Sequence, residues 1–594
     1  MKKNAPHTFH IPVMGLGFTI DTPIKVGRFG ISSTVSIIED NLIEQMREFY
    51  CRKFSLEYEA ITKKEFDYRA KRIRAYLNLL NEILQMQMIE LAAQPFGTGS
   101  DLDKYFGMLE ENSFLKLLYN TMLQSQDPQE KKTLEAELKK RLLPGAIDVN
   151  IMTKCDRSYS KGDEPDIYSD ALSALRGFAL SDLRSSIVFS AGLNPRLYSY
   201  CESFDDFYPA ANGEQKKKII IKVNDYRSAM IQGKFLAKKG LWVSEFRVES
   251  GLNCGGHAFP TEGLLLGPIL EEFKTKRDAL QAELFDICNN ALKAKGKQPY
   301  ALPPELSVSA QGGIGTAAEN KFLRDYYRLD ATGWGSPFLL VPEATSVDDE
   351  TLQALAGASP SDYFLSYSSP LGILFNNFRN SSSEKQRLKR IEKNRPGSPC
   401  LKKFLAFNTE FTSEPICTAS REYQQLKLNQ LKSQQLPEEE LKEKTELVMQ
   451  KDCLCEGLAV SAVIKNDILR PKQLKAVAIC PGPNLAYFSG VHTLRSMVDH
   501  IYGRKNLLNN VPRPSVIINE LKMYCEYLEK QVVKKEKSPS EEKYIVTFRN
   551  NLLSGIGYYK NLFAKFREEF SESFSLLKML EDHLALLLPQ QVPA

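Results

Sequence analysis

Apolar and polar positions along the chain form two alternating kinds of segment. Short runs rich in β-branched residues and bounded by turn residues are separated, for the most part, by stretches with apolar residues at helical spacing. The short runs cover residues 10–14, 31–38, 147–152, 186–190, 218–223, 243–249, 306–310 and 335–341. Such alternation is typical of parallel strands joined by helical crossovers, and eight units of this kind predict a closed (β/α)8 barrel of the TIM type.

One interval is too long for a single crossover. Residues 41–144 contain Leu, Ile and Met at helical spacing over 68–94 and charges four residues apart over 128–142. We therefore predict a large helical insertion between the second and third strands, which leaves residues 1–40 and 145–380 to form the barrel and its site.

Beyond the barrel the composition changes. Residues 381–594 predict a mainly helical C-terminal region that carries several cysteines, with a charged linker over 530–543. We expect this appendix to pack either on the barrel or on a second copy in a homo-oligomer.

Charge and hydropathy exclude several partners. The 78 basic and 73 acidic residues are interspersed, so the net charge of +5 forms no basic face for nucleic acid or anionic lipid. Residues 1–20 lack an unbroken apolar signal core, and the longest apolar run, 263–270, is far shorter than the roughly 20 residues that span a membrane. We expect a cytoplasmic protein whose 11 cysteines are mostly free thiols.

Two glycine-rich turns suggest a phosphate site. The turn Gly312-Gly313-Ile314 follows the seventh strand and precedes a helix beginning near Thr316, whose dipole would favour an anion. Gly335-Ser336 lies one unit later, and barrels commonly build a phosphate site from the loops after strands seven and eight. Either turn alone could be a tight turn without a ligand, but together they favour a bound phosphate.

His257 stands at the end of the sixth strand, after Gly255 and Gly256. The carboxyl ends of the strands line the active face of a barrel, where a histidine can act as a general base or donor near neutral pH. The alternative is a structural histidine bonded to a backbone carbonyl. The other five histidines lie at or before the first strand or in the appendix.

These motifs resemble, in order, those of the nitronate monooxygenase group of FMN barrels and of related enoyl reductases of fatty-acid and polyketide synthesis. The matching segments are Pro12-Val13-Met14-Gly15, Thr22-Pro23, Gly255-Gly256-His257, the turn at Gly312-Gly313, and Gly335-Ser336-Pro337-Phe338. The resemblance implies bound FMN, with His257 facing the substrate. It assigns the cofactor to Met14, Gly15, Asn150, Gly256, Gly312, Gly313, Ile314, Gly335 and Ser336. Lys222 could place positive charge near the flavin N1 and O2 edge, or could be an exposed lysine.

The resemblance leaves the reaction open. Pro337 replaces an arginine of the family pattern, Cys254 precedes the Gly-Gly-His, and Trp334 adds a ring at the phosphate loop. Two chemistries fit: oxidation of a small organic nitronate by O2, or reduction of an acyl-thioester substrate by NAD(P)H with an acyl carrier protein docked on the appendix. The alternatives are a non-catalytic scaffold barrel and a barrel enzyme acting on a phosphorylated metabolite.

Five cysteines of the appendix could gather into a redox site. They are Cys400, Cys417, Cys453, Cys455 and Cys480. Thiolates from separate loops can ligate an iron–sulfur cluster, but the Cys-x-x-Cys pairs typical of such sites are missing here, and buried thiols are the simpler interpretation, so we predict no metal site. A further alternative makes Cys254 a redox partner of the flavin.

Overall fold

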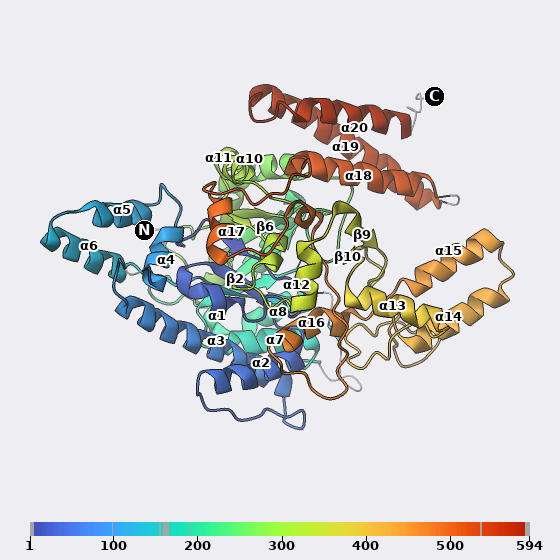
Figure 1. Ribbon diagram of the computed structural model, residues 1–594, viewed down its shortest axis with the longest axis horizontal. Coiled ribbons are helices and arrows are strands. Elements are labelled where there is room, and N and C mark those ends of the chain that lie inside the picture. The colour runs from blue at the N-terminus through green and yellow to red at the C-terminus, as the bar shows by residue number, and fades with distance from the viewer. Residues whose placement is uncertain are drawn as a thin grey trace.

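Eight parallel strands close into a barrel at the centre of the molecule, seen in the computed structural model of Figure 1. The structure describes residues 5–97, 99–153, 156–157, 166–190, 192–534 and 537–587. The strands are β1 (Phe9–Ile11), β2 (Ser32–Ser36), β3 (Ile147–Ile151), β4 (Ser185–Phe189), β5 (Lys217–Val223), β6 (Val243–Glu249), β7 (Ser307–Gln311) and β8 (Ala331–Gly333). β1 closes the barrel by pairing with both β2 and β8, which confirms the predicted (β/α)8 fold.

The predicted position of the eighth strand is wrong. The strand pairs through Ala331–Gly333, whereas most of the predicted run 335–341 forms a 3₁₀ helix, η4 (Ser336–Leu340). Pro337 has no N–H to donate to a neighbouring strand, and its fixed φ suits the first turn of a helix. The apolar residues that suggested a strand are instead buried in this short helix.

Helices surround the barrel and fill the crossovers. They are α1 (Thr22–Val26), α7 (Asp170–Ala179), α8 (Pro195–Tyr200), α9 (Tyr226–Ala237), α10 (Leu266–Ala294), α11 (Ala317–Tyr327) and α12 (Asp349–Ala356). Short 3₁₀ turns are η1 (Gly27–Phe29), η2 (Cys201–Ser203), η3 (Asp205–Phe207) and η5 (Pro360–Asp362). Among the described residues, no helix is both long and apolar enough to cross a membrane.

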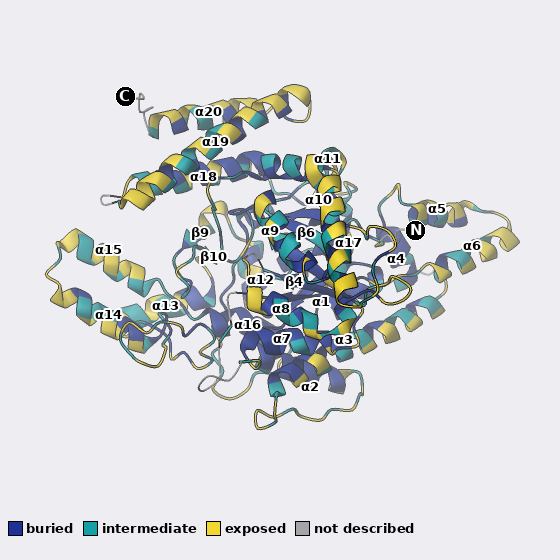
Figure 2. Ribbon diagram, turned by 180° about the vertical axis from the view of Figure 1, so that it is seen from behind, coloured by how far each residue is buried: buried dark blue, intermediate teal, exposed yellow. Residues whose placement is uncertain are grey.

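Five helices lie between β2 and β3, where the insertion is predicted. They are α2 (Asp40–Lys53), α3 (Tyr68–Ala93), α4 (Asp101–Met108), α5 (Phe114–Gln124) and α6 (Pro128–Lys140). α3 packs against α2 and α7 and buries its Leu, Ile and Tyr face, whereas the α5–α6 hairpin projects from the body with much of its surface exposed (Figures 1 and 2).

The C-terminal region follows a two-stranded antiparallel sheet, β9 (Tyr363–Ser366) and β10 (Phe375–Phe378). Its helices are α13 (Ser382–Glu392), α14 (Arg421–Ser433), α15 (Glu438–Met449), α16 (Leu454–Lys465), η6 (Pro483–Tyr487), α17 (Leu494–Ile501), α18 (Val516–Val532), α19 (Pro539–Lys565) and α20 (Ser573–Leu587). α16 is buried over nearly its whole length, while α14 and α15 form an exposed arm (Figures 1 and 2). α18, α19 and α20 pack into a layer around a second apolar core, which also includes Leu252, Ala258 and Leu265 of the loop after β6.

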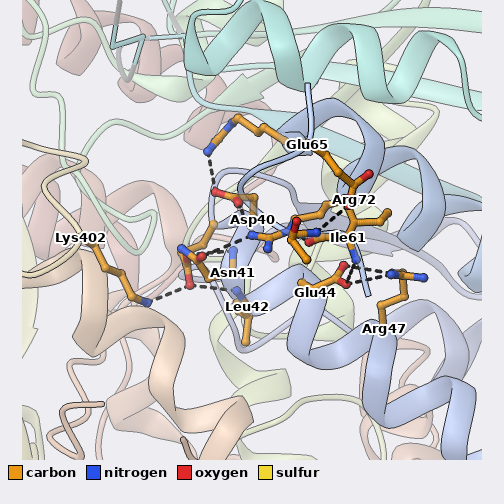
Figure 3. Close-up of polar contacts among 12 residues, drawn as sticks. Asp40, Asn41, Leu42, Glu44, Arg47, Ile61, Glu65, Arg72 and Lys402 are labelled. Atoms are coloured by element: carbon orange, nitrogen blue, oxygen red, sulfur yellow. Dashed lines mark hydrogen bonds and ion pairs between the residues drawn. The ribbon is translucent and has the colours of Figure 1, made fainter. Parts of the chain in front are cut away.

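A buried charge network joins the insertion and the C-terminal region at the start of α2 (Figure 3). Asp40 accepts hydrogen bonds from Arg69 at 2.9 Å and from Arg72 at 2.8 Å, and all three side chains are less than 9% exposed. The adjacent Glu39 caps α2 and pairs with Lys402 at 2.8 Å. Buried charges are tolerated only when paired, so this network fixes α2, α3 and the Lys402 loop relative to one another.

Asp40→Ala should lower the free energy of unfolding by about 3–5 kcal/mol, because the buried Arg72 would lose its carboxylate and the buried Arg69 would keep only the longer pair with Asp170 at 3.4 Å. Glu65→Ala serves as the control, since Glu65 pairs with Lys71 at the surface and its loss should change stability little. Urea unfolding of the two variants measures the difference, and equal stability losses would contradict this role of Asp40.

Candidate functional site

A cavity of about 250 Å³ opens at the carboxyl ends of the barrel strands. Every predicted site residue lines it: Met14, Gly15, Asn150, Lys222, Gly256, His257, Gly312, Gly313, Ile314, Gly335 and Ser336. These residues come from the loops after β1, β6, β7 and β8 and from the ends of β3 and β5. The barrel geometry therefore brings together residues that are up to 322 positions apart, as Met14 and Ser336 are (336 − 14).

One end of the cavity consists of the two glycine turns. Gly312 and Gly313 have φ values of 105° and 80°, in the region that favours glycine. Among the described residues, no acceptor takes the backbone N–H groups of Gly312, Gly313, Ile314, Gly335 or Ser336. Unpartnered amides that line a cavity from two adjacent loops form a cradle for an anion.

The helix N-terminus beside this cradle is already used, contrary to the expectation from the sequence. The N–H groups of Gly315 and Thr316 donate to the carboxylate of Glu319, which forms a capping box at the start of α11. Arg513 clamps the same carboxylate at 2.8 Å and donates to the Gly313 carbonyl at 2.6 Å. The loop amides, rather than the end of α11, are therefore the donors available to an anion.

A chain of polar side chains forms one wall of the cavity. Lys222 pairs with Glu249 at 3.1 Å, and the two side chains are 15% and 16% exposed. Gln311 donates to the same carboxylate at 2.7 Å and lies 3.4 Å from the ring of His10 in the barrel interior. Burial, together with the charge of Arg247, lowers the pKa of His10 to about 3, so this imidazole is neutral. Lys222 is thus a cavity-wall cation held by a neighbouring carboxylate.

Two asparagine side chains present unused acceptors. The Oδ1 atoms of Asn150 and Asn224 are buried and receive no hydrogen bond from the described residues. Both residues line the cavity. An unsatisfied buried acceptor costs free energy, which a ligand with an N–H donor would recover.

The loop after β6 holds His257 at the cavity wall. Its Nε2 hydrogen-bonds with the hydroxyl of Ser369 at 2.7 Å, and Phe375 packs edge-on at a ring separation of 5.1 Å. Asn376 in β10 donates to the Cys254 carbonyl at 2.7 Å. The chain that returns over the barrel mouth therefore fixes the His257 loop and orients its imidazole.

The C-terminal region supplies a further wall that the sequence motifs did not reveal. Phe404, Leu405, Leu454, Cys455, Leu458, Ile479, Cys480 and Asn484 all line the cavity. The N–H groups of Leu16 and Gly17 donate to the Leu458 carbonyl, which docks α16 against the loop after β1. Glu249 and Gln311 were also missed, although their position at strand ends could have indicated them.

Two departures from the family pattern have structural explanations. Burial raises the pKa of Cys254 well above its usual value, and the charge of Glu249 raises it further, so Cys254 stays a neutral thiol. Trp334 is 1% exposed and donates from its indole N–H to Thr332, away from the cavity lining.

Searches of protein-family models and of curated proteins each found no match. Among solved structures, the chain is similar to the structure of FabK from Thermotoga maritima, with a TM-score of 0.30 and 13% sequence identity over 68% of this chain and 85% of that chain.

Glu520 of α18 supports the β6 loop from outside the cavity. Its carboxylate accepts from the Ser250 hydroxyl at 2.6 Å and from the N–H of Leu266, at the start of α10, at 2.8 Å. Burial raises the pKa of Glu520 to about 7. Ser250 lines the cavity, so Glu520 connects the site to the C-terminal layer.

Glu520→Gln should remove a pH dependence of folding. Because the pKa of Glu520 is higher in the folded protein, the folded protein binds this proton more tightly than the unfolded chain does. The contribution of Glu520 to the free energy of unfolding is therefore greatest below about pH 4.5, and it falls by about 3 kcal/mol as the pH rises through about 7. Gln mimics the protonated acid, so the variant should lose this slope in urea unfolding between about pH 5 and pH 8. Glu526→Gln, on the exposed side of α18, should retain the slope, and a slope unchanged in both variants would contradict this prediction.

Proposed function

We propose that the cavity binds FMN and that the protein is an FMN-dependent oxidoreductase. The observation that carries the proposal is the set of unpartnered amides in the two glycine turns after β7 and β8. A phosphate accepts hydrogen bonds from such amides without any side-chain charge. The proposal is supported by the position of this cradle after β7 and β8, because barrels commonly bind a phosphate group there.

The rest of the cavity also suits a flavin. The unused Oδ1 atoms of Asn150 and Asn224 match the N–H donor of an isoalloxazine ring. Met14 and Gly15 supply a wall from the loop after β1, and Lys222, which is paired with Glu249, would offer positive charge to a reduced flavin. When bound, the flavin supplies hydride or electron exchange, which no side chain can provide.

The protein's own contribution is orientation and proton transfer. His257 faces the cavity with its Nε2 held by Ser369, so the imidazole can move a proton to or from a small organic or acyl-thioester substrate. The apolar side chains of Phe375, Phe404 and Leu454 line the same cavity and restrict water in it. The two substrate classes correspond to the two chemistries of the resembling family, with O2 or NAD(P)H as the co-substrate.

Purified protein supplied with FMN should show flavin absorbance near about 370 and 450 nm after free cofactor is removed. Gly313→Val should abolish this retention, because a side chain at φ 80° is strained and its Cβ would lie 2.7 Å from the Asn253 side chain. Gly213→Val is the matched control: its φ is 76°, but no atom of the described residues lies within 4 Å of the added Cβ.

Failure of the unmodified protein to retain FMN would overturn the proposal. Release of a different phosphorylated compound, identified by mass spectrometry, would favour a barrel enzyme acting on a phosphorylated metabolite. Equal retention by both valine variants would show that the phosphate turn is placed wrongly.

His257→Ala should keep the bound flavin and slow turnover by about 10²–10⁴-fold, the usual range for losing a general acid or base. Turnover is measured with an alkyl nitronate under O2 and, separately, with an enoyl thioester and NADPH. His583→Ala, on exposed α20, should leave both rates unchanged. A full rate in His257→Ala with either active substrate would exclude the proton-transfer role.

A further inference from the structure

Three successive carbonyls of the turn after β7 are each held by a side chain of the C-terminal region. The pairs are Arg513 with Gly313 at 2.6 Å, Asn484 with Ile314 at 3.0 Å, and His500 with Gly315 at 2.9 Å. The Nδ1 atom of His500 accepts from the N–H of Leu507, so its Nε2 carries a proton and is the donor. Side chains 170 to 200 positions further along the chain therefore hold the backbone of this turn.

Arg513 is the centre of this arrangement. Its side chain is 7% exposed and donates to both oxygens of the Glu319 carboxylate, at 2.8 and 2.9 Å, and to the Asn484 side chain at 2.7 Å. The guanidinium also lies against Gly315, where a Cβ would be only 2.6 Å from its Nε. Arg513 itself does not line the cavity. Since its charge is paired with a carboxylate, Arg513 acts on the turn through its fixed geometry rather than as a free cation.

Each held carbonyl also fixes the N–H that follows it. In a trans peptide, the C=O of one residue and the N–H of the next point in opposite directions. Arg513 holds the Gly313 carbonyl, so the N–H of Ile314 points away from Arg513, and Ile314 lines the cavity. No described residue accepts from that N–H, whereas the N–H groups of Gly315 and Thr316 donate to Glu319. Arg513 therefore contacts both the part of the turn that is satisfied and the part that is free.

The second glycine turn is also held from the C-terminal region. The N–H of Gly482 donates to the Ser336 hydroxyl at 2.7 Å. Ser336 and Gly335 line the cavity beside the turn after β7. Both halves of the anion cradle thus depend on contacts from outside the barrel.

We propose that Arg513 is a positioning residue for the anion cradle. By holding the Gly313 carbonyl and the Glu319 carboxylate together, it keeps the Ile314 N–H available to the phosphate of a bound cofactor. The role rests on the proposed binding of FMN and adds that affinity for the phosphate depends on a side chain outside the cavity. An amide that is oriented before binding loses little freedom when the ligand arrives, which favours tight binding.

Lysine cannot replace Arg513 in this role. A guanidinium is a planar fork that reaches the Gly313 carbonyl, the Glu319 carboxylate and Asn484 at the same time. An ammonium keeps the positive charge but lacks the fork. Arg513→Lys therefore separates the effect of geometry from the effect of charge.

Riboflavin, which lacks the phosphate of FMN, is the probe that isolates this role. Both flavins are titrated into the full-length protein after bound cofactor is removed, and flavin fluorescence gives the two dissociation constants. Hydrogen bonds to a charged acceptor each strengthen binding by roughly 10-fold or more, so the unmodified protein should prefer FMN to riboflavin by at least about 100-fold. Arg513→Lys should weaken FMN binding by about 10–100-fold and change riboflavin binding by less than about 3-fold.

Arg277→Lys is the matched control. Arg277 of α10 pairs with Asp330 at 2.6 Å and donates to the Leu306 carbonyl at 2.9 Å, beside the amino end of β7. It thus holds a carboxylate and a backbone carbonyl, as Arg513 does, but at the end of the strand away from the cavity, and its replacement should leave both dissociation constants unchanged. Far-ultraviolet circular dichroism verifies that each variant is folded, and Arg513→Gln replaces Arg513→Lys if the latter is not.

The outcomes separate a failure of this role from a failure of the proposed function. An undiminished preference for FMN in the folded Arg513 variant would overturn the role of Arg513 and leave FMN binding in place. Equal losses of affinity for both flavins would also overturn it, because they would show a general disturbance of the cavity. Unmodified protein that binds the two flavins equally would exclude the phosphate cradle, and protein that binds neither would overturn the proposed function together with the role of Arg513.

Discussion

The close approach of two backbones at the barrel mouth determines how the whole site is built. The Cys480 carbonyl accepts from the N–H of Gly256 at 3.0 Å, and a Cβ on Gly255 would lie only 2.6 Å from that same oxygen. Two positions later, the N–H of Gly482 donates to the Ser336 hydroxyl at 2.7 Å. The segment 480–484 therefore acts as a strap that joins the loops after β6 and β8. Only residues without side chains allow this contact, which explains why glycine is needed on both sides of it.

The fold was largely predictable because strand periodicity is a local signal. Seven of the eight strands overlap the predicted runs, and the insertion lies between the predicted pair of strands. The eighth strand was misplaced because Phe338 and its apolar neighbours read as a strand, whereas Pro337 makes a helical turn the better solution. Apolar content alone does not distinguish a buried strand from a buried helical turn, and here the apolar residues are buried in the helical turn.

The site was predictable only where its residues lie at strand ends. Asn150, His257 and the Gly312-Gly313 turn could be found because barrel geometry gives each strand end a known place. The contribution of α16 and of the strap could not be found in this way, since their contacts depend on tertiary packing across more than two hundred residues. Ser369, which hydrogen-bonds His257, could not be predicted either, because nothing in the sequence around a serine in a turn indicates which residue it will contact.

Long-range ion pairs make the three parts of the chain one structural unit. Lys402 reaches from the C-terminal region to Glu39 at the start of the insertion, and Arg513 reaches from before α18 to Glu319 beside the phosphate turn. Both carboxylates also cap helices, so each cation completes a helix end as well as an interdomain contact. The cavity thus lies between the barrel and the C-terminal region rather than within the barrel alone.

The cavity wall supplied by residues 404–484 has a consequence for biosynthesis. A ribosome extends the chain at about 5–20 residues per second, so the barrel strands emerge many seconds before the strap and α16. The nascent barrel therefore exposes its mouth, including the glycine turns, while the last wall is still being made. Enclosure of the cavity must therefore be a late event in maturation, completed only when the C-terminal region docks.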